Sequence, residues 1–183
     1  MSIAVAAPPR FLQVPGTLLG TVRRFVVGDR EPMDAVNVLR QIGYELGEEV
    51  YEALQGRVSR DFAGTEWAHL DPVEFWRAAA GFFHDRGWGS LAFHDAHPAL
   101  GVLELSDWAE GDAGGGPRGC HLTTGLMTAL LERLAGGGVA VMEVPSGDPA
   151  QTRLVFGRPD VLGGVYETVR DGGSVEDAVA KLG

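Results

Sequence analysis

The side chains best suited to chemistry gather around Cys120, the single cysteine among 183 residues. His121 follows it directly, and Glu143 lies further along, in an apolar segment typical of a strand. Cysteine, histidine and glutamate are residue types that bind zinc or build an activated nucleophile. Nucleophilic chemistry is disfavoured because adjacent side chains on a helix diverge by about 100°, which gives His121 poor geometry for acting as a base on Cys120. A single cysteine also excludes a disulfide within the chain.

The order of residues between 119 and 157 carries a motif. Its parts, in chain order, are Cys120-His121, Gly125, Met142-Glu143, the turn Gly147-Asp148-Pro149 and the strand-like stretch from Thr152 to Phe156. In order and spacing this segment resembles the signature half of the 4-vinyl reductase domain, a small ligand-binding module related to the TRAPP vesicle-tethering subunits. Weaker matches at 42–47 and 87–89 extend the resemblance over most of the chain.

The resemblance implies a zinc site that this chain keeps only in part. Zinc-binding members use the first cysteine, the glutamate and two later cysteines. Here Cys120 and Glu143 remain, whereas Ser146 stands where the next cysteine is expected and Thr152 lies close to the last position. Hydroxyl groups are poor zinc ligands at neutral pH. We therefore expect a degenerate site at Cys120 and Glu143 without zinc, no other cofactor, and a buried, inert thiol. Bound zinc, with His121 as a replacement ligand, is the alternative.

Aromatic side chains are the second candidate feature, since the chain has four tryptophans and eight phenylalanines. A fold of the resembled family encloses a small-molecule pocket, and such pockets are apolar with a few polar groups. We expect the pocket between the sheet and the helix at 71–86. The residues predicted to line it are Trp76, Phe83, Trp108, Leu126, His69 and His84. The alternative is that these aromatic side chains only fill the core.

Apolar periodicity predicts the elements that position these residues. Helices are expected at 33–55, 71–86, 121–135, 159–170 and 174–182, and strands at 89–94, 100–106, 139–144 and 152–157. Two hairpins interleaved with helices predict an α/β domain of the α+β type, with a mainly antiparallel sheet of about four strands covered by helices on one face. Residues 1–15 contain three prolines and are expected to form a flexible arm before a single domain at 16–183.

Charge and hydropathy exclude several classes of protein. The net charge of −10 argues against binding nucleic acid, which calls for a basic stripe. No apolar stretch approaches the ~20 residues of a membrane span. The first residues lack the basic segment of a signal peptide, so we expect a cytoplasmic protein. His94 and His97 flank a turn and resemble a chelating pair, but a solvated turn is the favoured interpretation.

Together these features predict a non-catalytic sensory domain that binds a small hydrophobic or aromatic molecule. The sequence shows no output motif, so a signal would pass through an unknown protein partner. Gly43 and Gly47 lie on one apolar helix face, which indicates close packing there, either of a second copy in a homodimer or of another helix of the same chain. One alternative function is an enzyme or accessory factor in tetrapyrrole vinyl reduction, although no dinucleotide or flavin motif is present. Another is a structural scaffold like the TRAPP subunits.

Overall fold

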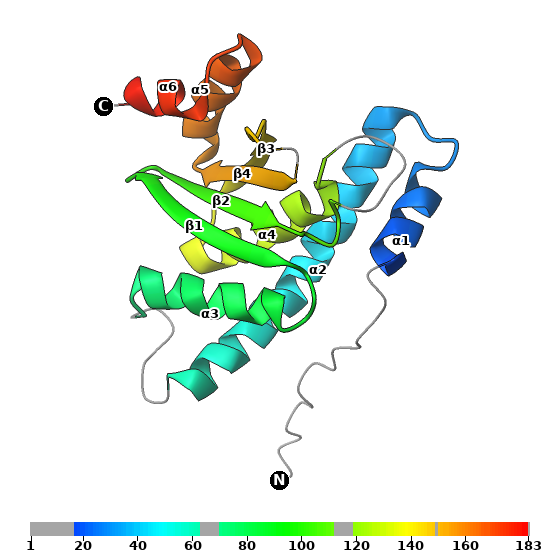
Figure 1. The fold of residues 1–183 in the computed structure, drawn as a ribbon, viewed down its shortest axis with the longest axis vertical. Helices are drawn as coiled ribbons and strands as arrows, with labels where there is room; N and C mark the ends of the chain where they lie inside the picture. The colour runs from blue at the N-terminus through cyan, green and yellow to red at the C-terminus, as the bar shows by residue number, and fades with distance from the viewer. Residues whose placement is uncertain (1–16, 63–69, 112–118, 149, 183) are drawn as a thin grey trace.

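The structure is a computed structural model that describes residues 17–62, 70–111, 119–148 and 150–182. Its elements are α1 (Thr17–Val27), α2 (Pro32–Asp61), α3 (Pro72–His84), β1 (Ser90–His97), β2 (Leu100–Ser106), α4 (His121–Ala135), β3 (Ala140–Val144), β4 (Gln151–Gly157), α5 (Pro159–Arg170) and α6 (Val175–Ala180). Figure 1 shows the sheet between α2, α3 and α4 on one side and α5 and α6 on the other. The predicted α+β class is confirmed. No helix in these ranges is long and apolar enough to span a membrane.

The sheet has the order β1-β2-β4-β3, and every neighbouring pair is antiparallel. Side chains alternate between the two faces of a strand. The sheet therefore contributes apolar side chains to two hydrophobic cores, one on each of its faces. Leu103 and Leu154 pair across β2 and β4 and face the core under α2, α3 and α4. Val102 and Val155 face the opposite side, where α5 and α6 cover them. Helices thus cover both faces, whereas the sequence analysis expected one covered face.

Local signals mark the helix ends well. Asp71 is the N-cap of α3 and accepts a hydrogen bond from the amide nitrogen of Val73 at 2.8 Å. Ser174 and Asp177 form a capping box at the start of α6. Gly136 ends α4 with φ 73°, a left-handed conformation that favours glycine. By contrast, α2 continues to Asp61, beyond the predicted end at 55.

The helices α2 and α4 pack with their backbones in contact. A Cβ atom added to Gly43 would lie 1.9 Å from the carbonyl oxygen of Leu122, and one added to Gly47 would lie 2.4 Å from the Cβ of Ala129. On the opposing helix, a Cβ at Gly125 would lie 2.0 Å from the carbonyl oxygen of Arg40. The face at Gly43 and Gly47 is therefore covered by α4 of the same chain. The hypothesis that this face is a dimer contact is wrong.

The helix α1 is not among the elements predicted from the sequence, and the arm expected at 1–15 lies outside the described residues. Figure 1 places α1 beside α2. Two of its apolar side chains are exposed, Leu18 at 41% and Phe25 at 82%. Arg23, on the same helix, is only 5% exposed. Apart from Gly20, the residue of α1 that is buried among those described is thus a charged one, which a search for an apolar face would miss.

Gly43→Ala should destabilise the protein strongly, because its methyl group would meet a backbone carbonyl that cannot rotate away. Overpacking of this kind costs about 1–3 kcal/mol or more. Gly56→Ala in the same helix is the matched control, since nothing lies within 4 Å of its added Cβ. It should gain up to about 1 kcal/mol from helix propensity. Urea denaturation of both variants measures the difference. Equal stability of Gly43→Ala and the wild type would contradict the described α2–α4 contact.

Candidate functional site

The first turn of α4 is held by the carboxylate of Glu110, a residue only 2% exposed. Its Oε1 accepts a hydrogen bond from the amide nitrogen of Leu122 at 2.9 Å. Its Oε2 accepts from the amide nitrogen of Thr123 at 2.7 Å and from the Thr123 hydroxyl at 2.7 Å. Helix N-termini leave amide groups without helical partners and favour negative charge. Glu110 therefore caps α4 from outside the helix.

Arg23 and Trp108 complete this buried polar cluster. The Nη1 atom of Arg23 lies 3.6 Å from Oε1 of Glu110 and donates a hydrogen bond to the carbonyl oxygen of Gly119 at 2.7 Å. The indole nitrogen of Trp108 donates to the hydroxyl of Thr123 at 2.8 Å. Neither Arg23 nor Glu110 was singled out from the sequence, because a long-range buried ion pair leaves no periodic signal.

Three of the residues expected at the degenerate metal site do come together. Oε2 of Glu143 accepts a hydrogen bond from the amide nitrogen of Cys120 at 2.6 Å, and Sγ of Cys120 lies 3.4 Å from Oγ1 of Thr152. Ser146 instead places its hydroxyl by the carbonyl oxygens of Asp148 and Gln151, within its own turn.

This donor set does not fit zinc. Cys120 is 1% exposed, one oxygen of Glu143 is engaged by the backbone, and Thr152 supplies only a hydroxyl. In the described parts of the chain, no three His, Cys, Asp or Glu side chains are grouped so as to hold a metal ion. The absence of zinc from the protein stays a prediction.

Burial raises the pKa of the Cys120 thiol to about 12. The hydrogen bond with Thr152 acts in the opposite direction, and the negative charges of Glu110 and Glu143 raise the pKa further. The thiol is therefore protonated at neutral pH, where the thiolate is the reactive form. Glu143 is exposed as a residue, yet its carboxylate lies against the backbone of Cys120. There burial raises the pKa of Glu143, while the hydrogen bond from Cys120 lowers it.

Three of the six predicted pocket residues lie in the core. Phe83, Trp108 and Leu126 are at most 3% exposed and belong to the core. The ring centroids of Phe83 and Trp108 are 5.5 Å apart. His84 is exposed at the end of α3, and His69 lies outside the described residues.

An open apolar groove of about 510 Å³ does lie between α3, the last turns of α4 and the sheet. Trp76, from the predicted set, lines it. Trp76 stacks on Phe93 with ring centroids 4.8 Å apart and an interplanar angle of 12°. The other lining residues, which the sequence analysis did not nominate, are Tyr51, Leu70, Pro72, Phe75, Leu131, Leu134, Ala135, Val139 and Phe156. No charged side chain is among these residues, so the groove suits an apolar or aromatic molecule.

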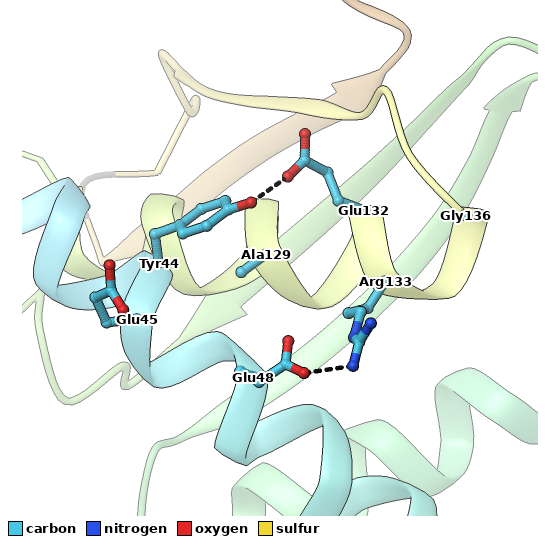
Figure 2. Close-up of a pocket in the computed structure, with 7 residues that line it drawn as sticks. All are labelled: Tyr44, Glu45, Glu48, Ala129, Glu132, Arg133 and Gly136. Carbon is cyan, nitrogen blue, oxygen red and sulfur yellow. Dashed lines mark hydrogen bonds and ion pairs between the residues drawn. The ribbon is translucent and has the colours of Figure 1, made fainter.

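A second pocket, of about 540 Å³, lies between α2 and α4 and is polar (Figure 2). Figure 2 shows Tyr44 pointing toward Glu132 and Glu48 pointing toward Arg133. Tyr44 donates a hydrogen bond to Glu132 at 2.8 Å, and Arg133 forms an ion pair with Glu48. These exposed groups satisfy each other across the two helices. The pocket is therefore a surface crevice that joins α2 to α4.

His94 and His97, which both lie in β1, do not form a chelating pair. His94 Nε2 lies 3.0 Å from Oε2 of Glu104, a diagonal neighbour on the adjacent strand β2. His97 instead accepts a hydrogen bond through Nδ1 from the amide nitrogen of Ala99 at 3.1 Å. Each ring thus has its own partner. The predicted turn at 94–98 is wrong, because β1 continues through His97.

No protein-family model and no curated protein matches the sequence. Solved structures share the fold. The phenol-responsive sensory domain of the transcription activator PoxR, in complex with phenol, is 16% identical with a TM-score of 0.61, covering 82% of this chain and 77% of that domain. Trafficking protein particle complex subunit 3 from Naegleria fowleri, covalently bound to palmitic acid, is 13% identical with a TM-score of 0.53, covering 78% of this chain and 92% of that subunit. At the level of the fold, these likenesses confirm the relation predicted from the motif.

Cys120 should resist thiol reagents in the folded protein. Burial and a pKa of about 12 leave little thiolate at pH 8 and no path for the reagent. Ellman's reagent should therefore label the native chain only as it unfolds, and should label the guanidinium-unfolded chain at once. Phe25→Cys, at a side chain 82% exposed, is a control that should react immediately in the native state. Rapid labelling of native wild-type protein would show that Cys120 is accessible.

Glu143→Gln should change how stability depends on pH. The pKa of a glutamate in the unfolded chain is near 4.3. When folding raises that pKa, the protonated group stabilises the folded state below about pH 4.3, and this stabilisation is lost as the pH rises through the pKa of the folded state. Glutamine keeps an oxygen for the amide of Cys120 but does not titrate. The free energy of unfolding of the variant should therefore rise relative to wild type as pH increases from about 4.3 to neutrality.

Glu176→Gln is a control of opposite sign for this experiment, because the hydrogen bond from Arg153 lowers the pKa of Glu176. Its variant should lose stability relative to wild type as pH rises. Urea denaturation at several pH values measures both differences. Parallel stability curves for Glu143→Gln and wild type would show that the folded state leaves the titration of Glu143 unchanged.

Proposed function

We propose that this protein is a non-catalytic sensory domain that binds a small, uncharged aromatic molecule in the groove beside Trp76. The observation that carries the proposal is the lining of the groove, which combines four aromatic rings with aliphatic side chains and no charge. Its volume of about 510 Å³ lies within the usual range for ligand sites, about 300–1,000 Å³. A shared fold with a phenol-responsive sensory domain supports the same conclusion.

The chemistry of the described side chains supports binding rather than catalysis. The single thiol is protonated and buried, and the polar side-chain groups among the lining residues of the groove are the hydroxyl of Tyr51 and the indole N–H of Trp76. Tyr51 and Trp76 are thus the candidates to orient a hydroxyl group of the ligand. The guanidinium of Arg133 lies 5.6 Å from the centroid of the Tyr51 ring and holds positive charge near this end of the groove.

An apolar acyl chain is the second candidate ligand, because the groove is open and a structural neighbour carries palmitic acid. Covalent attachment does not suit this chain. Its single cysteine, Cys120, is 1% exposed and lies in the core. A fatty acid would therefore have to bind without a thioester.

Self-association and signalling through a protein partner remain part of the proposal. Gly43 and Gly47 no longer support a dimer, because α4 covers them. Sedimentation velocity of the purified protein, with and without phenol, tests both the oligomeric state and its response to a ligand.

Phenol should raise the melting temperature of the wild-type protein in a thermal-shift titration. Binding to the folded state alone stabilises it by about 2.7 kcal/mol at a hundredfold excess over Kd. Leu134→Arg should abolish the shift by placing a charge in the groove. Leu46→Arg is the control, at a leucine of α2 that is 39% exposed, and it should respond like wild type. No response to phenols would overturn the proposal, and a response to palmitic acid alone would replace it with the acyl-binding function.

A further inference from the structure

Phe156, in the floor of the groove, lies across a glycine of the neighbouring strand. The antiparallel register pairs it with Gly101 of β2, and residues directly opposite each other share a face of the sheet. A Cβ atom added to Gly101 would lie 2.2 Å from Cζ of the Phe156 ring and 2.5 Å from its Cε1. The ring therefore occupies the space that any other side chain at position 101 would need.

The neighbours of Phe156 explain why its ring lies over Gly101. On its other side Phe156 pairs with Val141 of β3, a β-branched residue that is 8% exposed. The rings of Trp76 from α3 and Phe93 from β1 also lie near Phe156, with centroids 5.8 Å and 6.1 Å from that of its ring. The groove is the open space that remains beside the ring. A side chain at position 101 would thus push Phe156 into the groove.

We propose that Gly101 is a positioning residue that sets the depth of the groove, and so the size of the aromatic molecule that it accepts. This inference rests on the proposed function of the groove. A purely structural role for the pair is the alternative, since an aromatic ring over a strand glycine also stabilises a sheet. A structural role predicts altered stability alone, whereas a depth-setting role predicts altered selectivity between a small and a large ligand.

Phenol and 2-naphthol are suitable probes because they share a hydroxyl group and differ by one fused ring. Isothermal titration calorimetry measures both dissociation constants for each variant. The ratio compared below is the dissociation constant of phenol divided by that of 2-naphthol. Gly101→Ala should weaken the binding of 2-naphthol relative to that of phenol, so that the ratio falls by about tenfold or more. This is the scale on which a small steric change in a pocket discriminates between ligands. Adding Phe156→Leu to Gly101→Ala should restore the ratio, because leucine removes the displaced ring. Phe156→Leu alone should favour 2-naphthol, and this variant keeps the test available if Gly101→Ala does not fold.

The outcomes separate this inference from the function on which it rests. If wild-type protein binds neither phenol nor 2-naphthol, the proposed function fails and the role of Gly101 fails with it. If wild type binds both, but the ratio is unchanged in Gly101→Ala and in Phe156→Leu, only the depth-setting role is overturned. A ratio that falls in Gly101→Ala and recovers in the double variant supports the inference.

Discussion

The backbone contact between α2 and α4 is the constraint on which the rest of the structure depends. At Gly43 and Gly47 of α2 and at Gly125 of α4 there is no room for a side chain. These contacts fix the distance between the two helices and their position along each other. The helix α4 also connects the two hairpins of the sheet. Its first turn carries the buried carboxylate cluster, and Leu131 and Leu134 near its end form a wall of the groove. A shift of α4 would therefore alter both places at once.

The start of α4 shows how buried carboxylates can hold the first turn of a helix in place. Glu110 and Glu143 together accept hydrogen bonds from the backbone amides of Cys120, Leu122 and Thr123. A buried charge is tolerated when charge-assisted hydrogen bonds and an opposite charge surround it, and removing one partner from such a pair is costly. Arg23 supplies that opposite charge from α1. The docking of α1 is thus tied to the electrostatics of α4.

Local patterns predicted the elements well because their signals are local. The proline after Asp71 and the cap at Ser174 specify helix starts within a few residues, and 121–135 matches α4 in full. The carboxylate cluster was not predictable in the same way, because Arg23 and Glu110 meet only after folding. Periodicity also shows which residues are apolar without showing whether neighbours fill the space beside them. This is why Trp76 borders a groove while Phe83 lies in the core.

The cluster at the start of α4 has a further consequence for the chain around residues 112–118. On one side of this segment, Glu110 is bound to Leu122, and on the other, Gly119 is bound to Arg23. The chain thus leaves and returns at one anchored point, whatever the number of residues between. Closing a longer loop costs only about 0.6 kcal/mol for each doubling of its length. The two anchors, Glu110 and Gly119, are therefore held at the end of α4 opposite the groove by contacts that do not depend on the length of the chain between them.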